Sequence, residues 1–79
     1  MADVTQKQMQ VMSFIKSYTT TKRYSPTVRD MVKGLGVKST FAVTAHLNKL
    51  EAKGLITRES LVARSTLLTE EGEKALLKK

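Results

Sequence analysis

The segment PTVRDMVKGLGVKSTFAVTAHLNKLEAKGLI, from Pro26 to Ile56, carries two helical patterns joined by a short turn. Thr27 is suited to the N-cap of the first helix, and Gly36 can adopt the left-handed conformation that ends one. Only two residues separate Gly36 from Ser39, which is a good N-cap for the next helix. Because so short a turn prevents an antiparallel pair, the two helices are predicted to cross sharply, as in a helix-turn-helix over about residues 28–53.

The second helix of this pair is predicted from Thr40 to about Lys53, with Gly54 ending it. Val43, Leu47 and Leu50 recur at helical spacing and are expected to face the core. The outward face then carries Thr40, Phe41, Thr44, Ala45 and Asn48. Apart from the phenylalanine these are small or hydrogen-bonding side chains, which suit close approach to base edges. A helix that only met water would more often carry Glu and Lys there.

A first helix is predicted to begin after Thr5, because Thr5 and Gln8 have the spacing of a capping box. Its core-facing residues are expected to be Val11, Phe14, Ile15 and Tyr18. The branched side chains of Thr19 to Thr21 favour extended or turn backbone, so the helix is predicted to end in this run. Proline restricts the residue before it to extended geometry, and a very short strand is therefore predicted near Tyr24, ahead of Pro26.

Two short segments rich in branched or apolar residues, Leu55–Arg58 and Ser65–Leu68, predict a β-hairpin, or wing, over about residues 55–68. After it, Thr69 can cap a short helix over about residues 70–78, whose acidic first turn and terminal lysines complement the helix dipole. The predicted fold class is mainly α with a small β-hairpin. It is a winged helix-turn-helix of three helices, a wing and a short C-terminal helix, in one domain of residues 1–79.

Composition excludes several other classes of protein. The chain has 79 residues, which supports one small core and leaves no room for a deep substrate pocket beside it. It has no cysteine and one histidine, so neither a disulfide framework nor a metal site is expected. No apolar run is long enough for a membrane span or a signal peptide, and the expected location is the bacterial cytoplasm or nucleoid. With no catalytic constellation and no phosphate-binding glycine loop, neither an enzyme nor a cofactor is predicted.

The charge of +7 is concentrated in the middle of the chain. Between Lys16 and Arg58 there are nine basic residues and two acidic ones, whereas Glu70, Glu71 and Glu73 cluster near the end. A basic section of this kind attracts a polyanion, with an affinity that falls steeply with salt. Double-stranded DNA is therefore the first partner to consider. A merely solvated basic surface would show the same charge, while a basic membrane-surface helix would need a continuous apolar face that the sequence does not have.

Three stretches in register carry a family resemblance: TQKQMQVMSFIKSY, YSPTVRDMVKGLGVKS and HLNKLEAKGLI. The span from Thr5 to about Leu68 resembles the N-terminal winged-helix DNA-binding domain of the LexA repressors of the SOS response, and most closely the Gram-positive form. Gly36 and Gly54 match the family's glycines. The resemblance implies that a recognition helix from Ser39 to Lys53 enters the major groove, that neighbouring groups hold phosphates, and that the wing touches the backbone or the minor groove.

In the family, base contacts come from the N-terminal half of the recognition helix, and the chain departs from the family pattern there. Phe41 and Thr44 replace more polar residues, and Ala45 has no polar group. The family's operator sequence is therefore not expected to carry over, and contacts to thymine methyl groups would supply part of the discrimination. The residues predicted to bind DNA are Arg29, Lys38, Ser39, Thr40, Phe41, Ala42, Thr44, Ala45, Asn48, Lys49 and Arg64.

Several of these residues have alternative roles. Phe41 can read DNA or fold back on the preceding helix as part of the core. Arg64 in the wing is predicted to contact a phosphate or the minor groove rather than to be only solvated. His46 is predicted to pack or to contact the DNA backbone. Leu61 and Val62 sit at a wing tip, where apolar side chains do nothing for phosphate binding, so they either pack inward or mark a protein contact.

Full-length LexA proteins continue through a linker into a domain that dimerises and cleaves the linker with a serine and a lysine. This sequence stops at Lys79. It therefore predicts a DNA-binding regulator, repressor or activator, without a self-cleaving switch, with a phage or another mobile element as its suggested source. Binding to a palindromic operator as a pair of chains is expected, from a monomer or weak dimer free in solution.

A rival interpretation is a winged-helix adaptor that binds a protein, such as a host repressor or RNA polymerase. Its contact residues would be Leu61, Val62 and the terminal Leu76 and Leu77. The two interpretations differ experimentally, because only DNA binding should weaken with salt and respond to Thr44→Glu or Arg64→Ala. Adaptor binding should instead fail with Leu61→Asp.

Overall fold

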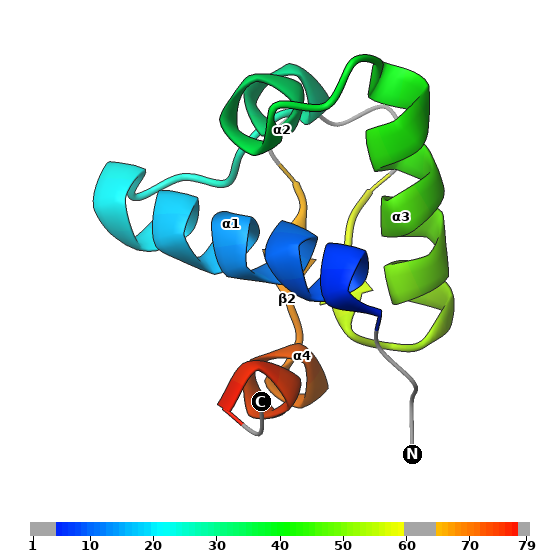
Figure 1. The fold of residues 1–79 in the computed structure, drawn as a ribbon. Helices are drawn as coiled ribbons and strands as arrows, with labels where there is room; N and C mark the ends of the chain where they lie inside the picture. Colours follow the sequence, from blue (N-terminus) through cyan, green and yellow to red (C-terminus); the bar gives the residue numbers. More distant parts are fainter. Residues whose placement is uncertain (1–4, 60–64, 78–79) are drawn as a thin grey trace.

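The computed structural model describes residues 5–59 and 65–77, and these form four helices and one antiparallel hairpin (Figure 1). The elements are α1 (Gln6–Lys22), α2 (Val28–Leu35), α3 (Thr40–Ala52), β1 (Ile56–Thr57), β2 (Leu67–Leu68) and α4 (Glu70–Leu77). Helices α1, α2 and α3 each pack against the other two, and the hairpin joins α3 to α4. The predicted fold class, mainly helical with a small hairpin, is confirmed.

Helix α1 begins as predicted and ends later than predicted. The Thr5 hydroxyl accepts the Gln8 N–H (3.1 Å), and the Gln8 side-chain oxygen accepts the Thr5 N–H (3.3 Å), which completes the capping box. The expected end within Thr19–Thr21 is wrong, because the helix continues to Lys22. Arg23 then takes a left-handed conformation with φ 71° and donates its N–H to the Thr19 carbonyl (2.9 Å), so the stop is a left-handed cap rather than the threonine run.

The strand predicted near Tyr24 does not form. Residues 23–27 are bends and irregular backbone, and the sheet described by the structure contains β1 and β2 only. Ser25 and Pro26 are buried in this connection. Pro26 has no N–H to contribute to a strand ladder, which is consistent with an unpaired connection here.

Both helices of the helix-turn-helix have the predicted caps. Thr27 and Asp30 form a second capping box at the start of α2, and Gly36 ends that helix at φ 70°. Ser39 accepts the Ala42 N–H at the start of α3 (3.3 Å). At the other end of α3, Gly54 (φ 75°) donates to the Glu51 carbonyl and the following residue donates to the Leu50 carbonyl. These two bonds form a Schellman motif.

The hairpin is shorter than the predicted four-residue strands. Two residue pairs are in register, Ile56 with Leu68 and Thr57 with Leu67. Two steps further along the same register, the Glu59 N–H donates to the Ser65 hydroxyl (2.9 Å), and that hydroxyl donates to the Glu59 carbonyl (3.2 Å). A serine side chain has taken the place of the backbone ladder there, which ends the regular strands.

Helix α4 is attached to the turn that follows α3. The Thr69 hydroxyl accepts the Gly72 N–H (3.0 Å), as predicted for its cap, and also donates to the Gly54 carbonyl (2.7 Å). The Thr69 N–H donates to the Leu55 carbonyl (3.0 Å). Gly72 is buried, and a Cβ atom on it would lie 2.1 Å from the Leu55 oxygen. The first turn of α4 therefore approaches the backbone as closely as a glycine allows.

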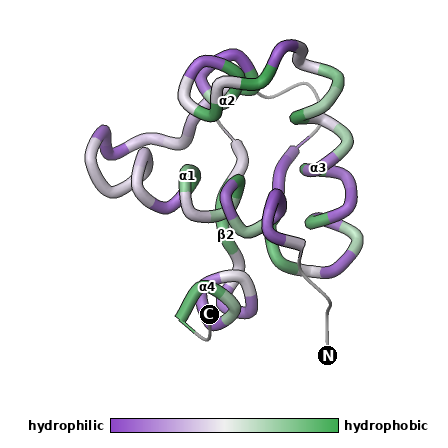
Figure 2. The backbone as a smooth tube through the Cα atoms, viewed as in Figure 1, coloured by the Kyte–Doolittle hydropathy of each residue, from purple (hydrophilic) through white to green (hydrophobic). Residues whose placement is uncertain are grey.

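One apolar core lies between α1, α2, α3 and the start of the hairpin. Its buried members are Val11, Met12, Ile15, Met31, Val43, Leu47, Leu50, Leu55 and Ile56. Of the residues predicted to face the core from α1, Phe14 and Tyr18 are only half-buried and stack on each other with ring centroids 5.7 Å apart. Hydrophobic and hydrophilic residues are interspersed along the helices (Figure 2), as expected for elements with one buried side. Within residues 5–59 and 65–77, none of the helices has the length and hydropathy needed to cross a bilayer.

Candidate nucleic-acid interface

Helix α3 presents one apolar side to the core and the opposite side to solvent. Val43, Leu47 and Leu50 are fully buried and hold the helix against α1 and α2. In Figure 1 the helix runs along one side of the molecule, with its N-terminal turn next to α2. The side of α3 opposite to these buried residues faces solvent, with Thr40, Phe41 and Asn48 exposed.

Phe41 lies in the first turn of α3 and is 81% exposed. Of its two predicted roles, folding back on α2 as core is therefore wrong, because the ring points away from the core. The physical reason is its place on the helix, two residues before the buried Val43 and on the opposite side. A phenylalanine this exposed next to hydroxyl and amide groups is the kind of apolar feature that marks a contact surface.

The remaining residues predicted on the recognition helix share its outer side to different extents. Ser39, Thr40, Asn48 and Lys49 are exposed, whereas Ala42, Thr44 and Ala45 are half-buried. Of these, Ser39 also uses its hydroxyl oxygen as the N-cap acceptor, which leaves its O–H available as a donor. The structure thus places these residues on one helix and its entry turn. Their individual roles on DNA remain predictions.

Exposed basic side chains lie on α3 and on the segment that precedes it. Arg29 in the first turn of α2 and Lys38 in the turn before α3 are exposed, as is Lys49. None of these three takes part in an ion pair within the part of the chain that the structure describes. Arg64, predicted in the wing, lies outside the described residues, as do Leu61 and Val62. His46 is half-buried on α3, and no cluster of metal-binding side chains occurs among residues 5–59 and 65–77.

Acidic side chains gather instead on α4. Glu73 pairs with Lys16 of α1, while Glu70 and Glu71 lie 3.4 and 3.9 Å from Lys74. Figure 1 shows α4 at the end of the molecule opposite to α2 and to the N-terminal turn of α3. The basic and acidic regions inferred from the sequence are thus separated in space, which favours one orientation of the molecule towards a polyanion.

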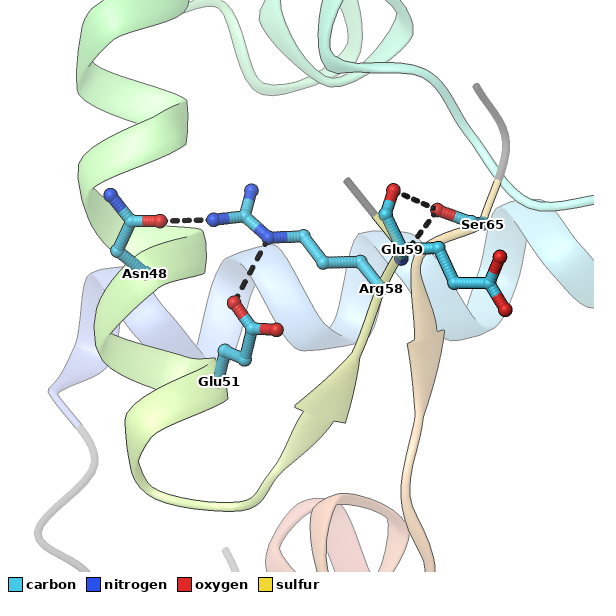
Figure 3. Close-up of polar contacts among 5 residues, drawn as sticks. All are labelled: Asn48, Glu51, Arg58, Glu59 and Ser65. Atoms are coloured by element: carbon cyan, nitrogen blue, oxygen red, sulfur yellow. Dashed lines mark hydrogen bonds and ion pairs between the residues drawn. The ribbon is translucent and has the colours of Figure 1, made fainter. Parts of the chain in front are cut away.

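A side-chain network that the sequence did not indicate joins the hairpin to α3 (Figure 3). Arg58, just after β1, donates through its terminal NH2 to the Asn48 side-chain oxygen. Its Nε lies 3.3 Å from the Glu51 carboxylate. Arg58 is absent from the residues predicted to bind DNA, because only the tertiary path of the hairpin back along α3 brings it to Asn48. The available signal was the opposite charge of Glu51 and Arg58 on either side of a glycine turn.

Three packed helices, a sharp turn between the second and third, an outward-facing third helix and a hairpin after it define a winged helix-turn-helix of the kind that binds DNA. Residues 1–65 match the family model described as the LexA DNA binding domain. The chain belongs to this family of DNA-binding domains, as the three sequence stretches had indicated.

Individual LexA repressors match about the same length of this chain. The LexA repressor of Clostridium novyi (strain NT) is 45% identical over 65 residues, which are 82% of this chain and 32% of that protein. The LexA repressor of Clostridioides difficile (strain 630) is 40% identical over 68 residues, 86% of this chain and 32% of that protein. That of Sorangium cellulosum (strain So ce56) is 37% identical over 65 residues, 82% of this chain and 28% of that protein. The chain thus spans about a third of the length of the relatives it matches.

Proposed function

We propose that this chain is a sequence-specific, double-stranded DNA-binding transcription regulator that reads the major groove with residues 39–53. The observation that carries this proposal is the outer side of α3, where an 81% exposed Phe41 stands among hydroxyl and amide groups. Exposed basic residues flank this side, while Glu70, Glu71 and Glu73 lie on α4. The LexA repressor relatives support repression as the mode of regulation.

The chemistry of this side divides into reading and anchoring. Phe41, Ala42 and Ala45 offer apolar contact to thymine methyl groups, and the hydroxyls of Thr40 and Thr44 can bond base edges. The exposed cations at Arg29, Lys38 and Lys49 are placed to neutralise phosphates, which sets the register of the protein without reading sequence. This chain's operator therefore contains thymines opposite the first two turns of α3.

Two chains on a palindromic operator, with half-sites about one helical turn apart, would place two such helices in successive major grooves. The bacterial cytoplasm or nucleoid is the corresponding location. An origin in a phage or another mobile element, and an activating rather than repressing role, remain predictions from the sequence.

The experiment that tests the proposal is selection of bound duplexes from a random DNA pool at moderate salt. The expected result is a symmetric motif with thymines in each half-site. The Thr44→Glu variant, which introduces a negative charge on the same side of α3, should recover no motif. Failure of the wild-type chain to enrich any motif would contradict sequence-specific binding.

An adaptor that binds a protein partner remains the alternative, and one observation favours it. Leu77 on α4 is 85% exposed and Leu67 on β2 is 48% exposed, and neither residue belongs to α3. Co-purification that is lost with Leu77→Asp or Leu61→Asp, yet retained with Thr44→Glu and at high salt, would support the adaptor over the regulator.

A further inference from the structure

Arg58 differs from Arg29, Lys38 and Lys49 in that its side chain bonds to described residues of α3. Its side chain is only 20% exposed and crosses from the end of β1 to the outer side of α3 (Figure 3). Glu51 lies 3.3 Å from its Nε and offsets its charge. Its terminal NH2 group donates to the side-chain oxygen of Asn48. Arg58 is thus tied to two residues of α3, one turn apart.

The bond from Arg58 determines which way the Asn48 amide faces. A side-chain amide has one acceptor oxygen and an NH2 group with two donors. Because the oxygen faces the guanidinium, the NH2 group must face the other way, and Figure 3 shows it pointing away from Arg58. Asn48 is exposed, so this donor is available to a ligand bound along α3.

An amide turned this way has a restricted use on DNA. An unconstrained asparagine reads adenine by donating to N7 and accepting from N6. With its oxygen turned towards Arg58, Asn48 presents its NH2 group, a donor, to a ligand on its other side. It lies seven residues, about two helical turns, beyond Phe41. Since base contacts in helix-turn-helix proteins come mainly from the start of the recognition helix, a donor this far along it is placed for the phosphate backbone.

We propose that Arg58 is a positioning residue that turns the Asn48 amide into a dedicated donor for a DNA phosphate. This inference rests on the proposed function. Arg58 itself acts through Asn48 rather than on the phosphate, because its charge is offset by Glu51 and most of its side chain is covered. The hairpin thereby contributes to DNA binding through α3, in addition to any contact of its own.

The test is a double-mutant cycle measured by fluorescence anisotropy over a series of salt concentrations. The proteins are the wild type, Asn48→Ala, Arg58→Met and the double variant, with Lys49→Ala as a matched control for a cation that contacts phosphate directly. Each is titrated with the selected duplex and with a scrambled one. Asn48→Ala is expected to weaken binding about three- to tenfold on both duplexes, since a phosphate contact carries no sequence information.

Arg58→Met should weaken binding by a similar factor, and the double variant should bind no more weakly than Asn48→Ala alone. The slope of log K against log salt should stay at the wild-type value in Arg58→Met, whereas Lys49→Ala should reduce it by about 0.9. Arg58→Lys, which keeps a donor for Asn48, should recover part of the loss. If Arg58→Met unfolds at the assay temperature, Glu51→Gln takes its place, and its smaller loss should likewise vanish in the Asn48→Ala background.

Additive losses together with a reduced salt slope in Arg58→Met would overturn the proposal and make Arg58 a direct phosphate contact. A loss confined to the selected duplex in Asn48→Ala would overturn it by assigning Asn48 to a base. In either case the wild type still binds its selected duplex, so the proposed function stands. Only a wild type that fails to discriminate the selected duplex from the scrambled one would contradict both the role of Arg58 and the proposed function.

Discussion

At the scale of the residue, function and stability are assigned to different side chains of the same helix. Val43, Leu47 and Leu50 hold α3 in place, and Phe41 contributes almost nothing to the core because it is exposed. Keeping a large apolar side chain in water has no benefit for folding, so its contribution is expected on binding.

Phe41→Ala is predicted to weaken binding of the selected duplex by about 1–3 kcal/mol, the range of one good base contact, and to leave binding of scrambled DNA unchanged. Stability should change by less than about 0.5 kcal/mol, because the ring is exposed. Replacing the thymines by uracil, which lacks the methyl group, should weaken the wild type but not the variant. Leu77→Ala, equally exposed but on α4, serves as the control and should alter neither measurement.

Backbone conformation at a single residue limits the stability of α1. Arg23 ends this helix at φ 71°, a conformation that costs a residue with a Cβ about 1–2 kcal/mol. Arg23→Gly removes that cost but increases the freedom of the unfolded chain. The net prediction is a gain of about 0.5 kcal/mol in the free energy of unfolding, measured by urea denaturation. Arg23→Ala keeps the strain and should give no gain; equal stabilisation by both variants would refute this explanation.

At the scale of the element, the helices differ in how far their sequences determine them. The N-caps at Thr5, Thr27, Ser39 and Thr69 and the stops at Gly36 and Gly54 were predictable, because capping depends on residues three or four positions apart. The end of α1 was not, since a left-handed arginine has no clear sequence signal. Nor was the absence of a strand near Tyr24, because strand formation requires a partner elsewhere in the chain.

The junction between α4 and the α3 turn is likewise tertiary in origin. Gly72 looks unfavourable within a helix, and by propensity alone Gly72→Ala should stabilise α4 by up to about 1 kcal/mol. The structure predicts the opposite sign, a loss of about 1–3 kcal/mol, because the added Cβ would meet the Leu55 carbonyl at 2.1 Å. The change in stability on thermal unfolding distinguishes the gain expected from helix propensity from the loss expected from the steric clash. Glu71→Ala, on the exposed side of the same turn, should be nearly neutral, and a stabilised Gly72→Ala would contradict the close approach.

At the scale of the whole molecule, the distribution of charge and the placement of α3 favour the same orientation of the protein towards DNA. The outer side of α3 and its basic neighbours lie away from the acidic α4, so a polyanion is attracted to the side that can read it. The fold and the outward face of α3 could be predicted from periodicity, caps and glycines. The Arg58–Asn48–Glu51 network could not, because it depends on the path of the hairpin back along α3.

The affinity ratio between the selected duplex and a scrambled duplex of equal length, measured from low to physiological salt, tests sequence-specific binding by α3 most directly. Both affinities should fall with salt, and the ratio at physiological salt should reach about 10³ or more for the wild type. In Thr44→Glu the ratio should collapse towards one while the fold remains intact by circular dichroism. A wild-type ratio near one, or binding insensitive to salt, would contradict the assignment of this chain as a sequence-specific DNA-binding regulator.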